Sequence, residues 1–126
     1  MKMFNETKKI MHSDVRCSAM CVRISSLRAH SEAVWVETDK TLTVEQVQEA
    51  IRNANGVTLL DDPSTQTYPM PLFTAGKDDV YVGRVRKDIA NDNGMTFWLS
   101  GDQIKKGAAL NAVQIAEYLI KVGNVK

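Results

Sequence analysis

A well-marked helix between two short apolar runs constrains the fold of this chain more than any other feature. Thr43 is followed three residues later by Gln46, the spacing of a capping box, and Gly56 supplies a left-handed stop. The apolar runs 33–36 and 57–60 lie on either side, and their length and composition predict strands. A strand, a helix and a second strand in succession predict a sheet with a helix packed on it.

The same reasoning extends to the rest of the chain. We expect a helix over 3–11, strands over 17–25, 32–38, 79–86 and 95–99, and a long closing helix over 104–119. The order of these elements predicts an α+β domain with a mixed, largely antiparallel sheet and helices packed on it. Because Ala33–Val36 is apolar at every position, its strand is expected to be covered on both faces.

Turn residues refine this outline at two places. Asn93-Gly94 predicts a type I′ hairpin between the last two strands. Pro69 and Pro71 lie in the long irregular stretch 61–77 and should exclude a regular helix there. A loop of this length within a compact domain is usually functional or lies at an interface.

Charge and hydropathy exclude several classes of function. With 16 basic and 15 acidic side chains the net charge is +1, so a nucleic-acid partner is not expected. No apolar run approaches the roughly 18 residues that span a bilayer, and the N-terminus lacks the apolar core of a signal peptide. We therefore expect a cytoplasmic protein without a membrane partner, folded as one domain over residues 1–126.

The two cysteines do not form a metal site by their spacing. Cys17 and Cys21 are not followed by a second Cys or His pair, so no metal is expected, and both are predicted to be buried apolar thiols. The first helix begins almost at the first residue, which suggests a segment of something longer.

Arg23 and His30 are the side chains with the clearest chemical potential. An arginine can bind a carboxylate through two parallel hydrogen bonds, and an imidazole can carry a proton near neutral pH. Both residues also have plain structural readings, as a solvated arginine and a structural histidine. Their separation of seven residues would place them on opposite faces of a flat strand, so they converge only if the chain bends near Ser25-Ser26.

Gln103 could serve either as a helix cap or as part of a binding site. It follows Ser100 by three residues, which suits a capping box, and it also lies where a helix N-terminus could bind an anion or a polar cofactor group. His12, beside Ser13 and Asp14, is expected to be an exposed residue at a helix end.

Several collinear motifs together resemble the C-terminal third of bacterial aspartate-β-semialdehyde dehydrogenases. The central motif runs from Cys21-Val22-Arg23 to His30-Ser31-Glu32-Ala33, and the others are 6–10, 61–63, 68–72, 75–78, 82–86 and 106–117. The resemblance implies the C-terminal domain of a glyceraldehyde-3-phosphate dehydrogenase-like fold. It also implies an NADP-dependent oxidoreductase that converts aspartyl phosphate to aspartate semialdehyde in lysine, methionine and threonine biosynthesis.

The resemblance also assigns roles to four residues of this chain. Arg23 matches the arginine that binds the substrate carboxylate, and His30 matches the catalytic acid/base. Lys2 falls where the family has a lysine for the acyl phosphate, and Gln103 falls where the family contacts NADP. Because members of the family are dimers, the resemblance also implies a homodimer.

Departures from the family pattern limit these expectations. The family's dinucleotide-binding domain and its nucleophilic cysteine, which lies in an upstream Asn-Cys motif, are not in this sequence, and Cys21 matches a different family cysteine. The substrate-binding glutamate ahead of the lysine would fall before Met1. We therefore expect a truncated catalytic and dimerisation segment that is inactive alone. The alternative is a standalone dimerisation or small-molecule sensing module, and a related acyl-phosphate reductase with another substrate is disfavoured by the motif match.

Overall fold

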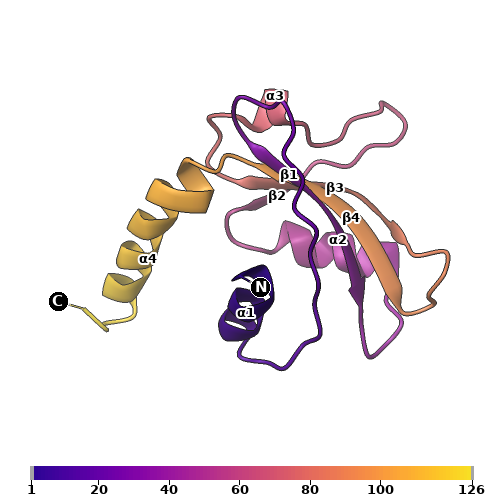
Figure 1. Cartoon of the computed structure of the whole chain (residues 1–126), viewed down its shortest axis with the longest axis horizontal. Helices are drawn as coiled ribbons and strands as arrows, with labels where there is room; N and C mark the ends of the chain where they lie inside the picture. The colour runs from indigo at the N-terminus through magenta and orange to yellow at the C-terminus, as the bar shows by residue number, and fades with distance from the viewer. Residues whose placement is uncertain (1, 126) are drawn as a thin grey trace.

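A mixed four-stranded sheet with helices around it forms the centre of this domain (Figure 1). The computed structural model describes residues 2–125. Its elements are α1 (Lys2–Met11), β1 (His30–Glu37), α2 (Val44–Arg52), β2 (Val57–Leu59), α3 (Pro71–Thr74), β3 (Val80–Lys87), β4 (Gly94–Gly101), the π-helical turn η1 (Lys105–Ala109) and α4 (Leu110–Lys121). The strand order is β1-β4-β3-β2, with β2 parallel to β3 and the other pairs antiparallel. The α+β prediction is confirmed.

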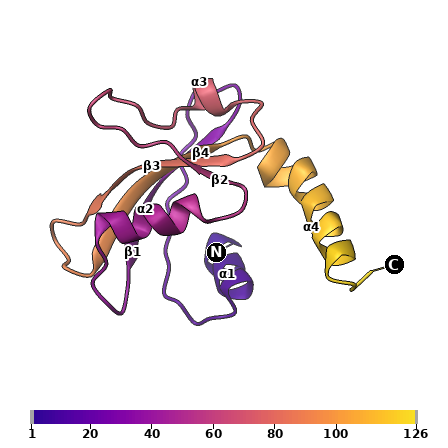
Figure 2. The same cartoon turned by 180° about the vertical axis from the view of Figure 1, so that it is seen from behind.

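Helix α2 begins as its sequence predicts, but it ends at Arg52 with Asn53 as its C-cap and not at Gly56. The Thr43 hydroxyl accepts a hydrogen bond from the Gln46 N–H at 3.2 Å, and the Gln46 side-chain oxygen accepts one from the Thr43 N–H at 2.8 Å. Gly56 has φ +72°, in the left-handed region that glycine adopts without strain. The helix contacts β2 and β3 and lies across one face of the sheet, which Figure 2 shows from the helix side.

Strand β3 carries a bulge that turns two arginine positions to the same surface. The pairing register with β4 shifts between Gly83 and Arg86, and Arg84 has φ +54°. The Asp61 carboxylate stabilises the bulge by accepting hydrogen bonds from the backbone N–H groups of Arg84 and Val85 at 2.8 and 3.0 Å. Arg84 and Arg86 consequently line one shallow hollow on the sheet.

The turn between β3 and β4 differs from the predicted type I′ hairpin. Neither Asn93 nor Gly94 has a positive φ, which a type I′ turn requires of its two central residues. Side chains close the loop instead, because Asp88 accepts from the Ala90 N–H and Asn91 accepts from the Asn93 N–H, both at 2.9 Å. These local bonds give the backbone an alternative to the tighter turn.

Three further predictions are corrected by the structure. Residues 17–25 form no strand, since nothing within residues 2–125 pairs with them, and Cys21 is exposed while Cys17 is only half-buried. Pro71 does not exclude a helix but begins the single turn of α3, because the first helical position needs no N–H donor. The closing helix is divided into η1 and α4.

Strand β1 lies at an edge of the sheet with one face open. The prediction that 33–36 is covered on both faces is wrong for the described chain, since Trp35 is 65% exposed. The reason is the position of α2, which contacts β2 and β3 at the opposite edge of the sheet. None of the helices within residues 2–125 is both long and apolar enough to cross a membrane.

Candidate active site

The chain bends between Arg23 and His30, which is the condition that the sequence set for the two side chains to converge. Bends occur at Ser25 and again just before Ala29, and Ala29 is buried with φ +72°. Arg23 and His30 are both exposed, and neither the guanidinium nor the imidazole has a hydrogen-bond partner within residues 2–125. Both groups are therefore free to meet a ligand, and the strand-parity argument that separated them does not apply to this bent segment.

His30 opens β1 and is held through its backbone. It lies opposite Gly101 of β4, and its carbonyl oxygen accepts a hydrogen bond from the buried Ser100 hydroxyl at 3.1 Å. The preceding N–H, that of Ala29, donates to the side-chain oxygen of Gln103 at 2.7 Å. The structure thus brings Gln103 next to His30 although 73 positions separate them.

The capping box proposed for Gln103 is absent. Ser100 belongs to β4, and its hydroxyl lies 2.8 Å from that of the buried Thr74. The residue that caps the following turn is Asp102, whose carboxylate accepts from the Ile104 N–H at 2.9 Å. An aspartate two residues before a helical turn is an ordinary N-cap signal, and reading it would have identified Asp102 from the sequence.

Asp102 is a fully buried carboxylate with several donors. Besides Ile104, it accepts hydrogen bonds from the Gly76 N–H at 2.6 Å, the Arg28 Nε at 2.8 Å and the Lys105 N–H at 3.4 Å. Burial by itself raises the pKa of the carboxyl group, but the backbone N–H groups and the Arg28 guanidinium outweigh that effect and hold the pKa below its ordinary value. Asp102 therefore remains ionised at neutral pH.

Lys2 and Arg23 lie on two segments that touch through other residues. The Cys21 thiol lies 3.4 Å from the Met3 sulfur, which places the Cys21–Arg23 segment beside the start of α1. Lys2 itself makes an exposed i,i+4 ion pair with Glu6 at 3.8 Å. No hydrogen bond or ion pair in the described part of the chain joins Lys2 or Arg23 to the His30–Gln103 group. Among the four sequence-predicted residues, the structure brings Gln103 beside the residue before His30 and shows no bond within residues 2–125 that joins Lys2 or Arg23 to them.

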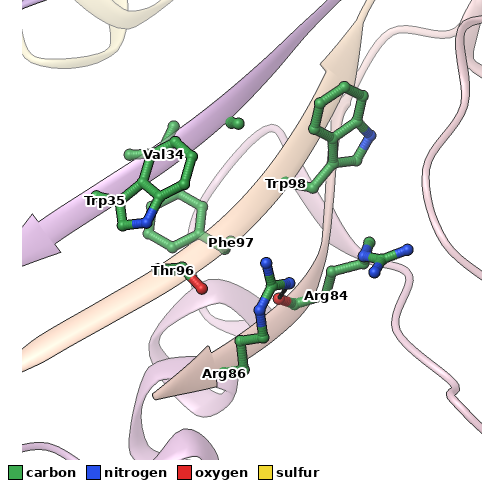
Figure 3. A pocket seen from close by; sticks show the side chains of 8 residues that line it. Val34, Trp35, Arg84, Arg86, Thr96, Phe97 and Trp98 are labelled. Carbon is green, nitrogen blue, oxygen red and sulfur yellow. Dashed lines mark hydrogen bonds between the residues drawn. The ribbon is translucent and has the colours of Figure 1, made fainter. Parts of the chain in front are cut away.

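His30 lines neither of two hollows found on the surface of the described residues. The smaller, about 70 Å³, lies on the open sheet face between Trp35, Trp98, Arg84 and Arg86 (Figure 3). It is far below the roughly 300–1,000 Å³ typical of small-molecule sites. The larger, about 330 Å³, lies between the Asn55–Gly56 turn and α4. Among residues 2–125 there is no cluster of three or more His, Cys, Asp or Glu side chains that could hold a metal ion.

Known proteins resemble this chain over nearly its whole length. A family model described as "Semialdehyde dehydrogenase, dimerisation domain" matches residues 1–106. Aspartate-semialdehyde dehydrogenases of Synechocystis sp. and Bacillus subtilis are 53% and 52% identical and align with 98% and 99% of this chain. The crystal structure of aspartate semialdehyde dehydrogenase II from Vibrio cholerae, complexed with ASA, covers 95% of this chain with a TM-score of 0.88 at 40% identity.

The fold is that of the C-terminal domain of a glyceraldehyde-3-phosphate dehydrogenase-like enzyme, as expected. More narrowly, the chain belongs to the aspartate-semialdehyde dehydrogenase family and matches its dimerisation domain. It spans 37% of the length of each of the two curated relatives and 35% of the Vibrio cholerae chain.

The buried Asp102 carboxylate predicts an acid-sensitive fold. Its pKa in the folded state lies below the unfolded value of about 3.9, so its stabilisation is complete above that pH and is lost as the pH falls through the folded pKa. We expect the Tm of this chain to fall on acidification below about pH 4, and to fall less in Asp102→Asn. Calorimetry across pH 2–6 measures both curves, with the exposed Asp14→Asn as the control that should follow the wild type. Parallel curves for all three proteins would contradict this role.

Proposed function

We propose that this chain is the C-terminal catalytic and dimerisation segment of an NADP-dependent aspartate-semialdehyde dehydrogenase. The reaction is the reductive dephosphorylation of aspartyl phosphate to aspartate semialdehyde and phosphate, which serves lysine, methionine and threonine biosynthesis. The proposal is carried by one observation above others, the pair of exposed, unpaired Arg23 and His30 side chains on a bent segment of a chain about half identical to such enzymes.

In this proposal, Arg23 and Lys2 bind the substrate and His30 transfers a proton. The Arg23 guanidinium offers a fork for the α-carboxylate of the substrate, and Lys2 offers a point charge for the acyl phosphate. His30 takes up the proton of the attacking nucleophile and returns it, because an imidazole exchanges protons near neutral pH.

The chain offers a polar group that suits a nicotinamide cofactor. The Gln103 oxygen is committed to the Ala29 N–H, which fixes the amide orientation and leaves the two N–H donors of Nε2 without a partner within residues 2–125. Those donors match the carboxamide oxygen of a nicotinamide. When bound, NADPH supplies the hydride of the reaction.

Neither cysteine of this chain is suited to be the nucleophile. The Cys17 thiol lies 3.8 Å from the Phe4 carbonyl oxygen and the Cys21 thiol lies against Met3, both at the start of α1. A nucleophilic thiol needs a nearby base, and no imidazole or amine is hydrogen-bonded to either thiol within residues 2–125. We propose that the nucleophile lies on sequence outside this chain, as in the family.

A chimera provides the test of this function. In it, this chain replaces the matching 37% of the Bacillus subtilis relative, and the reverse reaction is followed as NADP⁺ reduction with aspartate semialdehyde and phosphate. We expect the chimera to turn over and the 126-residue chain alone to show no turnover above the blank. A folded but inactive chimera, or an active isolated chain, would overturn the proposal. The first of these outcomes would favour a standalone dimerisation or sensing module.

The open face of the sheet is the surface we propose for a homodimer. It lies opposite α2 and presents Trp35 and Trp98 on neighbouring strands with Arg84 and Arg86 beside them (Figure 3). The Thr96 hydroxyl is buried there without a hydrogen-bond partner in the described chain. A second copy would cover the tryptophans, in keeping with the dimerisation-domain match.

We expect Trp35→Glu to weaken self-association by about 30-fold or more, because a buried charge would replace an aromatic anchor worth about 2 kcal/mol or more. Sedimentation of the chain over a range of concentrations measures the dissociation constant. The control is Ile89→Glu, which changes a fully exposed residue of the β3–β4 loop. This change should leave the dissociation constant unchanged. A monomeric wild type, or equal effects of the two changes, would contradict the interface.

A further inference from the structure

Ala29 holds a backbone conformation that other parts of the fold must maintain. Its φ of +72° is uncommon for a residue with a β-carbon, and its side chain is only 4% exposed. Such a conformation persists when surrounding contacts determine it, and it directs the chain into His30 at the start of β1. The contacts that hold Ala29 therefore also set the direction in which the His30 side chain leaves the backbone.

Three consecutive residues are held from one short segment. The Arg28 Nε donates to Asp102 at 2.8 Å, the Ala29 N–H donates to Gln103 at 2.7 Å, and the His30 carbonyl accepts from Ser100 at 3.1 Å. Each partner lies within residues 100–103, at the end of β4. Residues 28–30 are thus hydrogen-bonded, one after another, to side chains of a single four-residue segment.

Asp102 is the most constrained member of this segment. Its carboxylate is fully buried and is fixed from two sides by the N–H groups of Gly76 and Ile104, at 2.6 and 2.9 Å. One oxygen is held by the turn that follows β4, and the other is shared by Gly76 and Arg28. A charge held this rigidly fixes the Arg28 guanidinium, and with it the turn that precedes His30.

We propose that Asp102 is a positioning residue for His30, acting through the Arg28 guanidinium and the Ala29 turn. Asp102 does not touch substrate or cofactor in this role. The inference rests on the proposed function, since it needs His30 to act as acid/base. A misplacement of about 1 Å can lower turnover by about 100-fold, so removing the Asp102 charge affects the chemical step and leaves the carboxylate site at Arg23 intact.

The Bacillus subtilis chimera carries the test, and the double-mutant comparison is its decisive part. We expect Asp102→Asn to lower kcat by about 10- to 100-fold with the KM for aspartate semialdehyde within about twofold. The same change made in the His30→Ala variant should alter kcat by less than about threefold, because the imidazole that it positions is already gone.

Arg28 supplies a second pair of variants in case Asp102→Asn folds poorly. Arg28→Lys keeps the charge opposite Asp102 and should retain most of the turnover, whereas Arg28→Met should lose as much as Asp102→Asn. Arg28 is 44% exposed, so these changes spare the core. The control is Glu49→Gln, which breaks the exposed Arg52–Glu49 pair at 3.4 Å and should leave kcat unchanged.

The outcomes separate the inference from the function beneath it. If His30→Ala leaves kcat unchanged, the proposed function fails. If His30→Ala lowers kcat but Asp102→Asn and Arg28→Met do not, the positioning role fails. Equal losses from Asp102→Asn with and without His30 would assign Asp102 a general structural role and would also overturn the inference.

Discussion

Replacing His30 by alanine is expected to lower kcat in the Bacillus subtilis chimera by about 10²- to 10⁴-fold, the usual contribution of a general acid/base. The imidazole is exposed and has no partner within residues 2–125, so its loss should leave the fold intact and remove proton transfer alone. Initial rates of NADP⁺ reduction with aspartate semialdehyde and phosphate measure kcat, and an unchanged Tm confirms folding.

His12 provides the matched control for this change. It is the only other histidine of the chain, it is exposed at the end of α1, and it has φ +48°. Asparagine tolerates this backbone region, so His12→Asn should keep kcat within about twofold. A His30→Ala enzyme with kcat within threefold of the parent would refute the assignment of His30 as acid/base.

Replacing Arg23 by alanine is expected to raise the KM for aspartate semialdehyde by roughly 10- to 150-fold, since hydrogen bonds to charged groups contribute about 1.5–3 kcal/mol. The kcat should change less, because the carboxylate lies away from the reacting carbon. The KM of Arg23→Lys should lie between those of the parent and of Arg23→Ala, because a lysine keeps the charge and loses the bidentate fork. Saturation curves for the three chimeras separate KM from kcat.

Arg16 is the control for the Arg23 change. It is an exposed arginine on the same irregular segment, and its removal alters the net charge by the same amount. We expect Arg16→Ala to leave the KM within about twofold. Equal rises in the KM for both variants would show a general charge effect and would exclude a specific carboxylate site at Arg23.

Predictions based on contacts between near neighbours in the sequence were the accurate ones. The capping box of Thr43 and Gln46 and the left-handed φ of Gly56 involve residues three apart or a single backbone angle, and both are confirmed. The helix itself ends earlier than predicted, at Arg52. The hairpin turn shows the limit of such rules. Asn93-Gly94 suits a type I′ turn, but the Asp88 and Asn91 side chains bond to nearby backbone N–H groups and favour a wider loop.

Predictions that needed a partner distant in the sequence were less accurate. Residues 17–25 have the composition of a strand, yet a strand forms only where another one pairs with it, and none does within residues 2–125. The apolar run 33–36 predicts a strand covered on both faces, yet this strand lies at the edge of the sheet. Gln103 was assigned to a local cap, yet its oxygen bonds to the distant Ala29.

The roles of Lys2, Arg23, His30 and Gln103 came from the resemblance, and they stay predictions that the kinetics above will test. The structure adds how they are grouped. The sulfur atoms of Met3 and Cys21, which neighbour Lys2 and Arg23 in the sequence, are in contact, and the Gln103 oxygen accepts from the N–H of Ala29, the residue before His30.

Local chemistry in the sequence was sufficient to predict an α+β domain and the start of α2, and it identified a bend as the condition for Arg23 and His30 to converge. The tertiary structure alone decided which residues hold that bend. Asp102 reaches Arg28 across 74 positions, and the end of β4 meets the start of β1 only because the two strands pair antiparallel. Hydrogen-bond partners so far apart are set by the register of the sheet, which depends on the whole chain and not on any short stretch of it.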